Sequence, residues 1–194
     1  MDSTGLEPVT AQQAWKVLEQ ADRLYTGSQI EVALEGMAHA ITQQLADRDL
    51  LLVCLMNGGL VPFGKLLPML PFPLQIDYIH ATRYGNRLHG TDLRWMAGPY
   101  LPPQGRSILL VDDILDEGAT LAAIEDYYLK QGAREVFKAV MVKKERPRSL
   151  SIDAEFIGLM VPDRYVFGYG MDYKGYLRNA PGIFAVAESS HQPQ

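Results

Sequence analysis

The chain has 194 residues, of which 47% are hydrophobic and 21% are charged, so we expect one globular domain rather than a disordered chain or a two-domain enzyme. A formal net charge of −5 argues against non-specific binding to nucleic acid or to an anionic membrane. Cys54 is the only cysteine, the longest apolar run is far too short to span a membrane, and the first residues do not resemble a signal peptide, so we expect a soluble, cytoplasmic protein.

Two helices are predicted before the first strand. Thr10 and Gln13 form a capping-box pattern ahead of the first helix, and Ser28 and Glu31 repeat that pattern ahead of the second. The second helix places its apolar residues on one face: Ile30, Leu34, Met37, Ile41 and Leu45.

A change of pattern marks the first strand. Residues 50–56 are apolar without alternation, which is typical of a strand covered by helices on both faces of a parallel sheet. Asn57-Gly58-Gly59 ends this run and leads into a short helix over about 60–70. Further strands are predicted over residues 74–79, 93–97, 107–111, 135–142, 155–160 and 164–167. Strands that alternate with helices predict an α/β fold with a mainly parallel sheet, whose ligand lies beyond the carboxyl ends of the strands.

The most informative segment is 108–121, where a buried strand leads through an acidic turn into a helix predicted over about 119–131. A turn that opens a helix presents unpaired N–H groups and the positive end of the helix dipole, so it can hold a phosphate without lysine or arginine. Gly118 allows close approach of the backbone, and the Thr120 hydroxyl can donate a further hydrogen bond. The segment therefore favours a phosphate site.

The carboxylates of this turn need a separate explanation. Asp112 and Asp113 can accept hydrogen bonds from two ribose hydroxyls, or the acidic residues can serve a magnesium ion. Composition alone supports a simpler interpretation equally well. In it, Asp116 only caps the helix, and the other acidic residues are solvated.

The pattern Asp-Asp-x-x-Asp-x-Gly-x-Thr between a strand and a helix resembles the phosphoribosyl pyrophosphate (PRPP) motif of the type I phosphoribosyltransferases. Three further segments resemble, in the same order, the hypoxanthine-guanine phosphoribosyltransferases: Val142-Lys143, residues 155–173 and Tyr176-Leu-Arg178-Asn179. The resemblance covers about residues 28–187. It implies a twisted, mainly parallel sheet flanked by helices, a small purine-binding hood and a mobile loop. We expect one domain over residues 1–194, with a tail at 188–194.

The resemblance also implies an activity. The family transfers the phosphoribosyl group of PRPP to hypoxanthine or guanine, giving IMP or GMP and pyrophosphate, with Mg²⁺ as cofactor. Two alternatives are a preference for xanthine and a non-catalytic regulator that senses PRPP or nucleotides. Family members are dimers or tetramers, so a homodimer or homotetramer is expected here.

By resemblance, the acidic turn holds the ribose phosphate and the catalytic base. Asp116 would be the general base beside purine N7, and Asp112 and Asp113 would hold the ribose hydroxyls. The cradle of the 5′-phosphate would consist of Glu117, Gly118, Ala119 and Thr120. The family usually has Thr or Ser at the position of Glu117, so the Glu117 carboxylate must point away from the phosphate.

The resemblance places pyrophosphate at the turn after the first strand. Asn57 and Gly58 would contact pyrophosphate, and a cis peptide is expected at Met56-Asn57. Arg178 would bind pyrophosphate oxygens, and Asp172 would coordinate magnesium. Many relatives carry lysine at the position of Asn57, so pyrophosphate here should depend more on magnesium and Arg178.

The purine would lie between the later strands. Lys143 would donate to the purine O6 and so disfavour adenine, with Lys144 as the competing candidate because this turn is one residue longer than in some relatives. Tyr165 would stack on the base, and Val166 would offer backbone groups to its edge. Arg83 and Tyr84 match the mobile loop that closes over the reaction, although relatives often have Ser at the position of Arg83.

Overall fold

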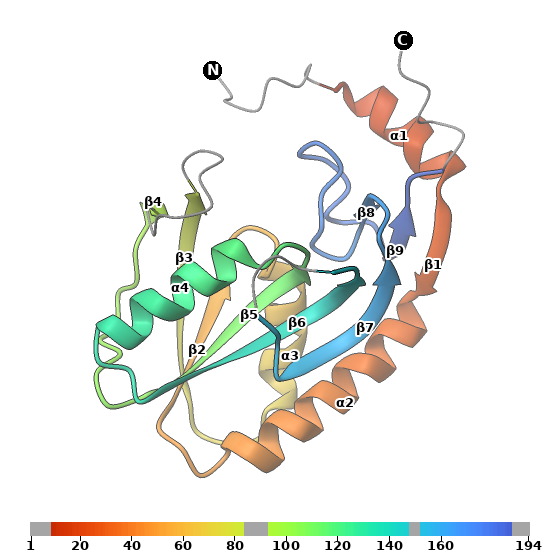
Figure 1. Ribbon diagram of the computed structural model, residues 1–194. Helices are drawn as coiled ribbons and strands as arrows, with labels where there is room; N and C mark the ends of the chain where they lie inside the picture. Colours follow the sequence, from red (N-terminus) through yellow and green to blue (C-terminus); the bar gives the residue numbers. More distant parts are fainter. Residues whose placement is uncertain (1–8, 84–92, 148–151, 188–194) are drawn as a thin grey trace.

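The computed structural model describes residues 9–83, 93–147 and 152–187, and its centre is a six-stranded sheet in the order β4-β3-β2-β5-β6-β7 (Figure 1). The strands are β2 (Leu50–Leu55), β3 (Gln75–Arg83), β4 (Leu93–Ala97), β5 (Ser107–Leu115), β6 (Glu135–Glu145) and β7 (Phe156–Pro162). All neighbours from β3 to β7 are parallel, and β4 adds an antiparallel edge. The sheet confirms the predicted fold class.

Helices cover both faces of this sheet. Helix α2 (Gly27–Leu45) and helix α3 (Leu60–Leu66), which continues into a 3₁₀ turn (Leu67–Met69), lie on one face. Helix α4 (Ala119–Lys130) lies on the other, and α1 (Ala11–Gln20) lies apart from the sheet near the amino end (Figure 1). In the part of the chain that the structure describes, no helix is long and apolar enough to cross a membrane.

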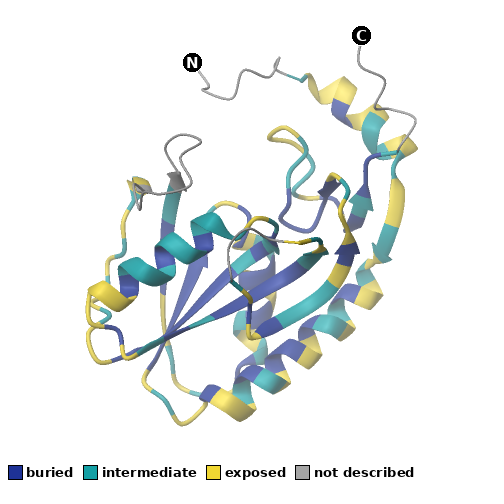
Figure 2. Ribbon diagram, viewed as in Figure 1, coloured by how far each residue is buried: buried dark blue, intermediate teal, exposed yellow. Residues whose placement is uncertain are grey.

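Strand β2 shows why its sequence is apolar without alternation. Successive side chains of a strand point to opposite faces. Leu50, Leu52 and Cys54 pack in the cluster beneath α2 and α3, whereas Leu51, Val53 and Leu55 pack in the cluster beneath α4. All of them are buried (Figure 2). The predicted two-sided burial of this strand is confirmed.

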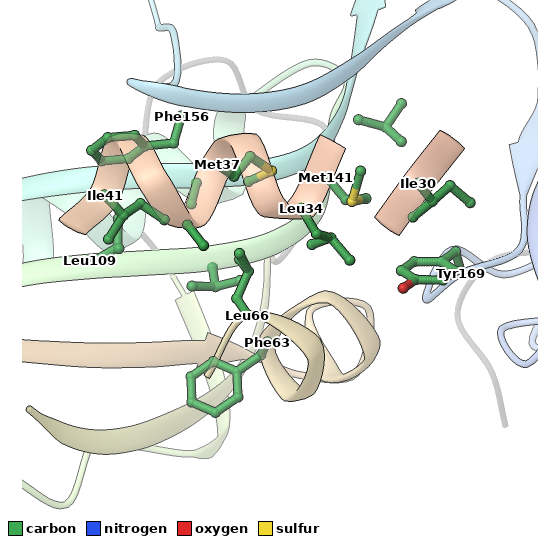
Figure 3. Packing of buried hydrophobic residues seen from close by; sticks show 14 of the residues in the cluster. Ile30, Leu34, Met37, Ile41, Phe63, Leu66, Leu109, Met141, Phe156 and Tyr169 are labelled. Atoms are coloured by element: carbon green, nitrogen blue, oxygen red, sulfur yellow. The ribbon is translucent and has the colours of Figure 1, made fainter. Parts of the chain in front are cut away.

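Helix α2 presents the predicted apolar face to the sheet. Ile30, Leu34, Met37 and Ile41 meet residues of α3 and of the central strands in one continuous cluster (Figure 3). The helix begins two residues earlier than predicted because Thr26, whose backbone is extended, is the N-cap.

The capping box proposed for this helix was therefore wrong, whereas that of Thr10 and Gln13 at α1 is confirmed. Thr26 and Gln29 form the box at α2: the Gln29 N–H donates to Thr26 Oγ1 at 3.3 Å, and the Thr26 N–H donates to Gln29 Oε1 at 2.9 Å. Ser28 already lies inside the helix. Glu31 instead accepts from Lys65 Nζ at 2.7 Å and from the Tyr169 hydroxyl at 3.0 Å.

A second, three-stranded antiparallel sheet stands beyond the carboxyl ends of β6 and β7 (Figure 1). Its strands are β1 (Asp22–Thr26), β9 (Gly182–Ala185) and β8 (Val166–Phe167). Two of these strands, β1 and β9, were not predicted. Both are short, and the partner of β1 lies about 160 residues away in the sequence. This sheet has the position expected of the hood, so loops of the hood and of the main sheet face one another.

Candidate functional site

A pocket of about 260 Å³ opens at the carboxyl ends of β5 and β6, beside the hood. Its lining consists of Asp113, Ile114, Asp116, Lys144, Tyr165, Val166, Met171 and Asp172. The structure thus brings together predicted site residues from the acidic turn, from β8 and from the loop before β9. Of the lining residues, Ile114 and Met171 were not singled out from the sequence.

Asp116 lies at the mouth of this pocket as an ion-paired carboxylate. Its Oδ2 accepts from Lys144 Nζ at 2.7 Å, and its Oδ1 accepts from Arg146 Nη1 at 3.0 Å. The N-cap of α4 is Gly118, which has no side chain with which to cap the helix. Asp116 is therefore not the N-cap residue of α4, and its two oxygens bind cations instead.

The turn before α4 has the backbone expected of a phosphate loop. Gly118 adopts a φ of +77°, and a Cβ there would lie 2.4 Å from Ile152 Cγ2, so glycine is required. The first N–H groups of a helix have no acceptor within the helix, and the N-cap glycine has no side chain that could supply one. Ala119 and Thr120 begin the helix, while the exposed Glu117 carboxylate pairs with Arg146 Nη2 at 2.7 Å.

Asp112 and Asp113 are adjacent carboxylates at the end of β5. The Asp113 N–H donates to Asp112 Oδ1 at 2.9 Å. Burial raises the pKa of Asp112 well above its ordinary value, and the neighbouring Asp113 charge raises it further. Burial also raises the pKa of Asp113, with opposition from the Arg178 guanidinium. Holding two such groups at the end of β5 costs stability, and Asp113 is the one of the two that lines the pocket.

This cost predicts the pH dependence of stability. Between the ordinary carboxyl pKa of 3.8 and the raised value, the folded protein binds more protons at this pair than the unfolded chain, so the pair lowers stability as pH rises. We expect Asp112→Asn to be more stable than wild type at pH 7.5, with a difference that shrinks as pH falls toward 4. Urea unfolding across that range measures it. Glu19→Gln, an exposed carboxylate of α1, is the control; a pH-independent difference for Asp112→Asn would contradict the prediction.

The turn after β2 packs directly against this acidic pair. The Met56-Asn57 peptide is cis, as expected. A Cβ at Gly58 would lie 2.1 Å from Asp113 Oδ2, and a Cβ at Gly170 would lie 2.4 Å from the Gly58 carbonyl oxygen. Asn57 is exposed. Three distant segments therefore meet at Gly58 with no space for a side chain.

We expect Gly58→Ala to lower the free energy of unfolding by about 1–3 kcal/mol, because the added methyl group must displace Asp113. Chemical denaturation measures this change. Gly64→Ala on α3 is the matched control, since a Cβ there meets nothing within 4 Å. Equal stabilities of the two variants would contradict the prediction.

Arg178 joins the hood to the acidic pair. Its Nη2 lies 2.5 Å from Asp172 Oδ1, and its Nη1 donates to the Gly170 carbonyl at 2.6 Å. Nη1 also lies 3.6 Å from Asp113 Oδ2. The second oxygen of Asp172 accepts from the Gly175 N–H at 2.7 Å. A guanidinium in this position can bind an anion that enters between the hood and the turn after β2.

The side chains of the two candidate lysines, Lys143 and Lys144, point to different places. Lys143 Nζ lies 2.7 Å from both carboxylate oxygens of Asp153, away from the pocket. Lys144 lines the pocket and contacts Asp116. Neighbouring residues of β6 point to opposite faces, so only one of them can face the ligand. Lys144, the competing candidate, therefore lines the pocket, whereas Lys143, the first choice from the sequence, does not.

The aromatic wall of the pocket comes from the hood. Tyr165 is 42% exposed, its hydroxyl accepts from the Lys174 N–H at 3.3 Å, and its ring meets Tyr173 edge-on at 5.5 Å between centroids. Val166 is buried in β8 and lines the pocket beside it.

The proposed mobile loop falls mostly outside the described residues. Arg83 ends β3 and pairs with Leu93 of β4. Tyr84 lies outside the described ranges.

Arg146 was missed by sequence reasoning. It follows β6 and contacts Asp116 and Glu117, and it also lies 3.6 Å from Asp163. The one signal for it was the longer turn after Lys143, which places an additional cation opposite the acidic turn.

The donor set suits magnesium. Among residues 9–83, 93–147 and 152–187, no three His, Cys, Asp or Glu side chains gather as a complete metal site. Mg²⁺ is usually held by one or two carboxylates together with waters and substrate phosphates. Asp172 supplies a partly exposed carboxylate that lines the pocket, so the residues present fit a magnesium ion that arrives with a phosphate ligand.

The mainly parallel sheet flanked by helices, the glycine turn before α4 and the second small sheet define an α/β protein of the type I phosphoribosyltransferase class. Residues 20–174 match the family described as the phosphoribosyl transferase domain. The chain belongs to this family.

Known proteins agree with this assignment. The human hypoxanthine-guanine phosphoribosyltransferase is 26% identical over 165 residues, which cover 80% of this chain and 76% of that protein. The Aquifex aeolicus protein of the same name is 27% identical over 143 residues, covering 73% and 80%. A crystal structure of a hypoxanthine phosphoribosyltransferase from Staphylococcus aureus shares the fold, with a TM-score of 0.84 at 21% identity over 91% of this chain and 97% of that chain.

Proposed function

We propose that the chain is a purine-salvage enzyme that transfers the phosphoribosyl group of PRPP to hypoxanthine or guanine. The observation that carries the proposal is one pocket in which Asp116, Lys144 and Tyr165 lie beside the phosphate loop of α4. The names of its relatives favour this function over a xanthine-preferring enzyme or a non-catalytic regulator.

The purine would enter between the hood and the acidic turn. Its imidazole edge would meet Asp116, which accepts the N7 proton, and its O6 would accept from Lys144 Nζ. The Tyr165 ring would stack on the base, while backbone groups of Val166 would meet its edge. An exocyclic amine in place of O6 would present hydrogens to the Lys144 ammonium, which disfavours adenine.

The ribose phosphate would lie along the turn before α4. Its hydroxyls would be held by Asp112 and Asp113, and its 5′-phosphate by backbone N–H groups of residues 117–120 and by the Thr120 hydroxyl. The leaving pyrophosphate would meet the turn at Asn57 and Gly58 and the Arg178 guanidinium. Asp172 would hold Mg²⁺, which neutralises pyrophosphate charge when bound.

Assembly and location form a further part of the proposal. We propose one domain over residues 1–194 that acts in the cytoplasm as a homodimer or homotetramer. Exposed apolar side chains of Leu60, Ile76, Tyr78 and Tyr100 surround a second cavity of about 600 Å³, and they offer a contact surface for another subunit.

Initial rates with PRPP, Mg²⁺ and four bases test the proposal. Turnover of hypoxanthine or guanine, with weak or absent turnover of adenine, is the expected result. Xanthine as the best substrate would favour the first alternative. Binding of nucleotide without turnover of any base would favour the regulator and overturn the proposal.

A further inference from the structure

The phosphate loop of this chain contains a negative charge of its own. Glu117 stands at the first position of the cradle, and residues 117–120 include no lysine or arginine. A carboxylate beside a bound phosphate repels it, and the repulsion is strong where water is partly excluded. Binding of a phosphate here therefore requires an interaction that holds the Glu117 carboxylate away from the N–H groups of α4.

The contacts of Arg146 suit it to hold the Glu117 carboxylate in this way. Its Nη2 lies 2.7 Å from Glu117 Oε1, and its Nη1 lies 3.0 Å from Asp116 Oδ1. Asp163 approaches the same nitrogen at 3.6 Å. The Arg146 side chain is 28% exposed and that of Glu117 is 55% exposed, so water screens their ion pair from the Glu117 side.

Arg146 is not the only cation that contacts Asp116 among the described residues. Lys144 Nζ also binds Asp116, at 2.7 Å, from within the pocket. Loss of Arg146 therefore leaves Asp116 with a cation, whereas it removes the 2.7 Å ion pair that holds Glu117 to the turn after β6. The distinctive contact of Arg146 is the one with Glu117.

We propose that Arg146 is a positioning residue for PRPP: it draws the Glu117 carboxylate toward the turn after β6 and so leaves the cradle at α4 open to the 5′-phosphate. The proposal rests on the proposed function, because it takes the phosphate to be that of PRPP. Glu117 and Arg146 act as one unit, in which each charge compensates the other.

A double-mutant cycle on wild type, Arg146→Gln, Glu117→Thr and the double variant tests the proposal. We expect Arg146→Gln to raise the KM for PRPP about tenfold with kcat within about threefold, since the freed carboxylate weakens binding rather than chemistry. In the Glu117→Thr background the same change should have little effect on KM. Arg146→Lys, which keeps the charge, should recover most of the loss. Lys130→Gln, which breaks an exposed ion pair at the far end of α4, is the control.

Titration with ribose 5-phosphate separates this proposal from the proposed function. Its Kd should follow the same cycle even if wild type turns over no base, in which case only the proposed function fails. An equal loss of affinity from Arg146→Gln in both backgrounds would mean that Arg146 acts directly or structurally, and it would overturn the proposal. No loss from Arg146→Gln in either background, or no binding of ribose 5-phosphate by wild type, would overturn it as well.

Discussion

Replacing Asp116 with Asn is expected to lower kcat for hypoxanthine and guanine about 10²- to 10⁴-fold while the KM for PRPP changes little. The amide keeps the size of the carboxylate but cannot accept the N7 proton. The neutral amide binds Lys144 and Arg146 more weakly than the carboxylate does, so we expect a modest change in base binding together with the loss of rate. Steady-state kinetics with each substrate varied in turn separate the two effects.

Asp163→Asn is the matched control for this substitution. Asp163 belongs to the same charged cluster, at 3.8 Å from Lys144 Nζ and 3.6 Å from Arg146 Nη1, but it does not line the pocket. Its replacement removes the same formal charge and should leave kcat within about threefold of wild type. Equal losses in both variants would show that the net charge of the cluster matters, and they would remove Asp116 from the role of base.

Lys144→Met is expected to lower kcat/KM for hypoxanthine and guanine about 10- to 100-fold, the usual effect of losing a hydrogen bond from a charged group. Adenine should lose far less, because the ammonium that opposes its amino group is gone. The ratio of kcat/KM for hypoxanthine to that for adenine should therefore fall. Rates on both bases, measured at subsaturating concentration, give this ratio directly.

Lys143→Met provides the comparison within the same strand. Lys143 pairs with Asp153 outside the pocket, so its replacement should leave the ratio unchanged. If Lys143→Met lowers the ratio and Lys144→Met does not, the side chain that reads the purine is Lys143 after all, as first predicted from the sequence.

Much of the fold follows from local sequence. The uninterrupted apolar run of β2 predicts burial on both faces, and the apolar face of α2 predicts its packing. The acidic turn between β5 and α4 is also local, since the strand, the turn and the helix start lie within one short segment. Such features depend on periodicity and turn chemistry, which neighbouring residues determine together.

Features that depend on residues far apart in the sequence could not be predicted from local sequence patterns. Strand β1 pairs only with β9, at the other end of the described chain, whereas β9 also pairs with β8. The N-cap of α2 is Thr26 rather than the predicted Ser28. Strand β1 ends at Thr26, and the helix begins at the next residue.

The sequence by itself determined the fold class, the family and the segments that contribute to the pocket, because motifs and periodicity are short-range properties. Only the tertiary structure decided which lysine lines the pocket, since a shift of one residue along β6 moves a side chain to the other face. It also decided the partners of Asp116 and Glu117. The cations that hold these carboxylates come from the end of another strand, roughly 30 residues further along the chain, and only the packing of β6 beside β5 brings them together.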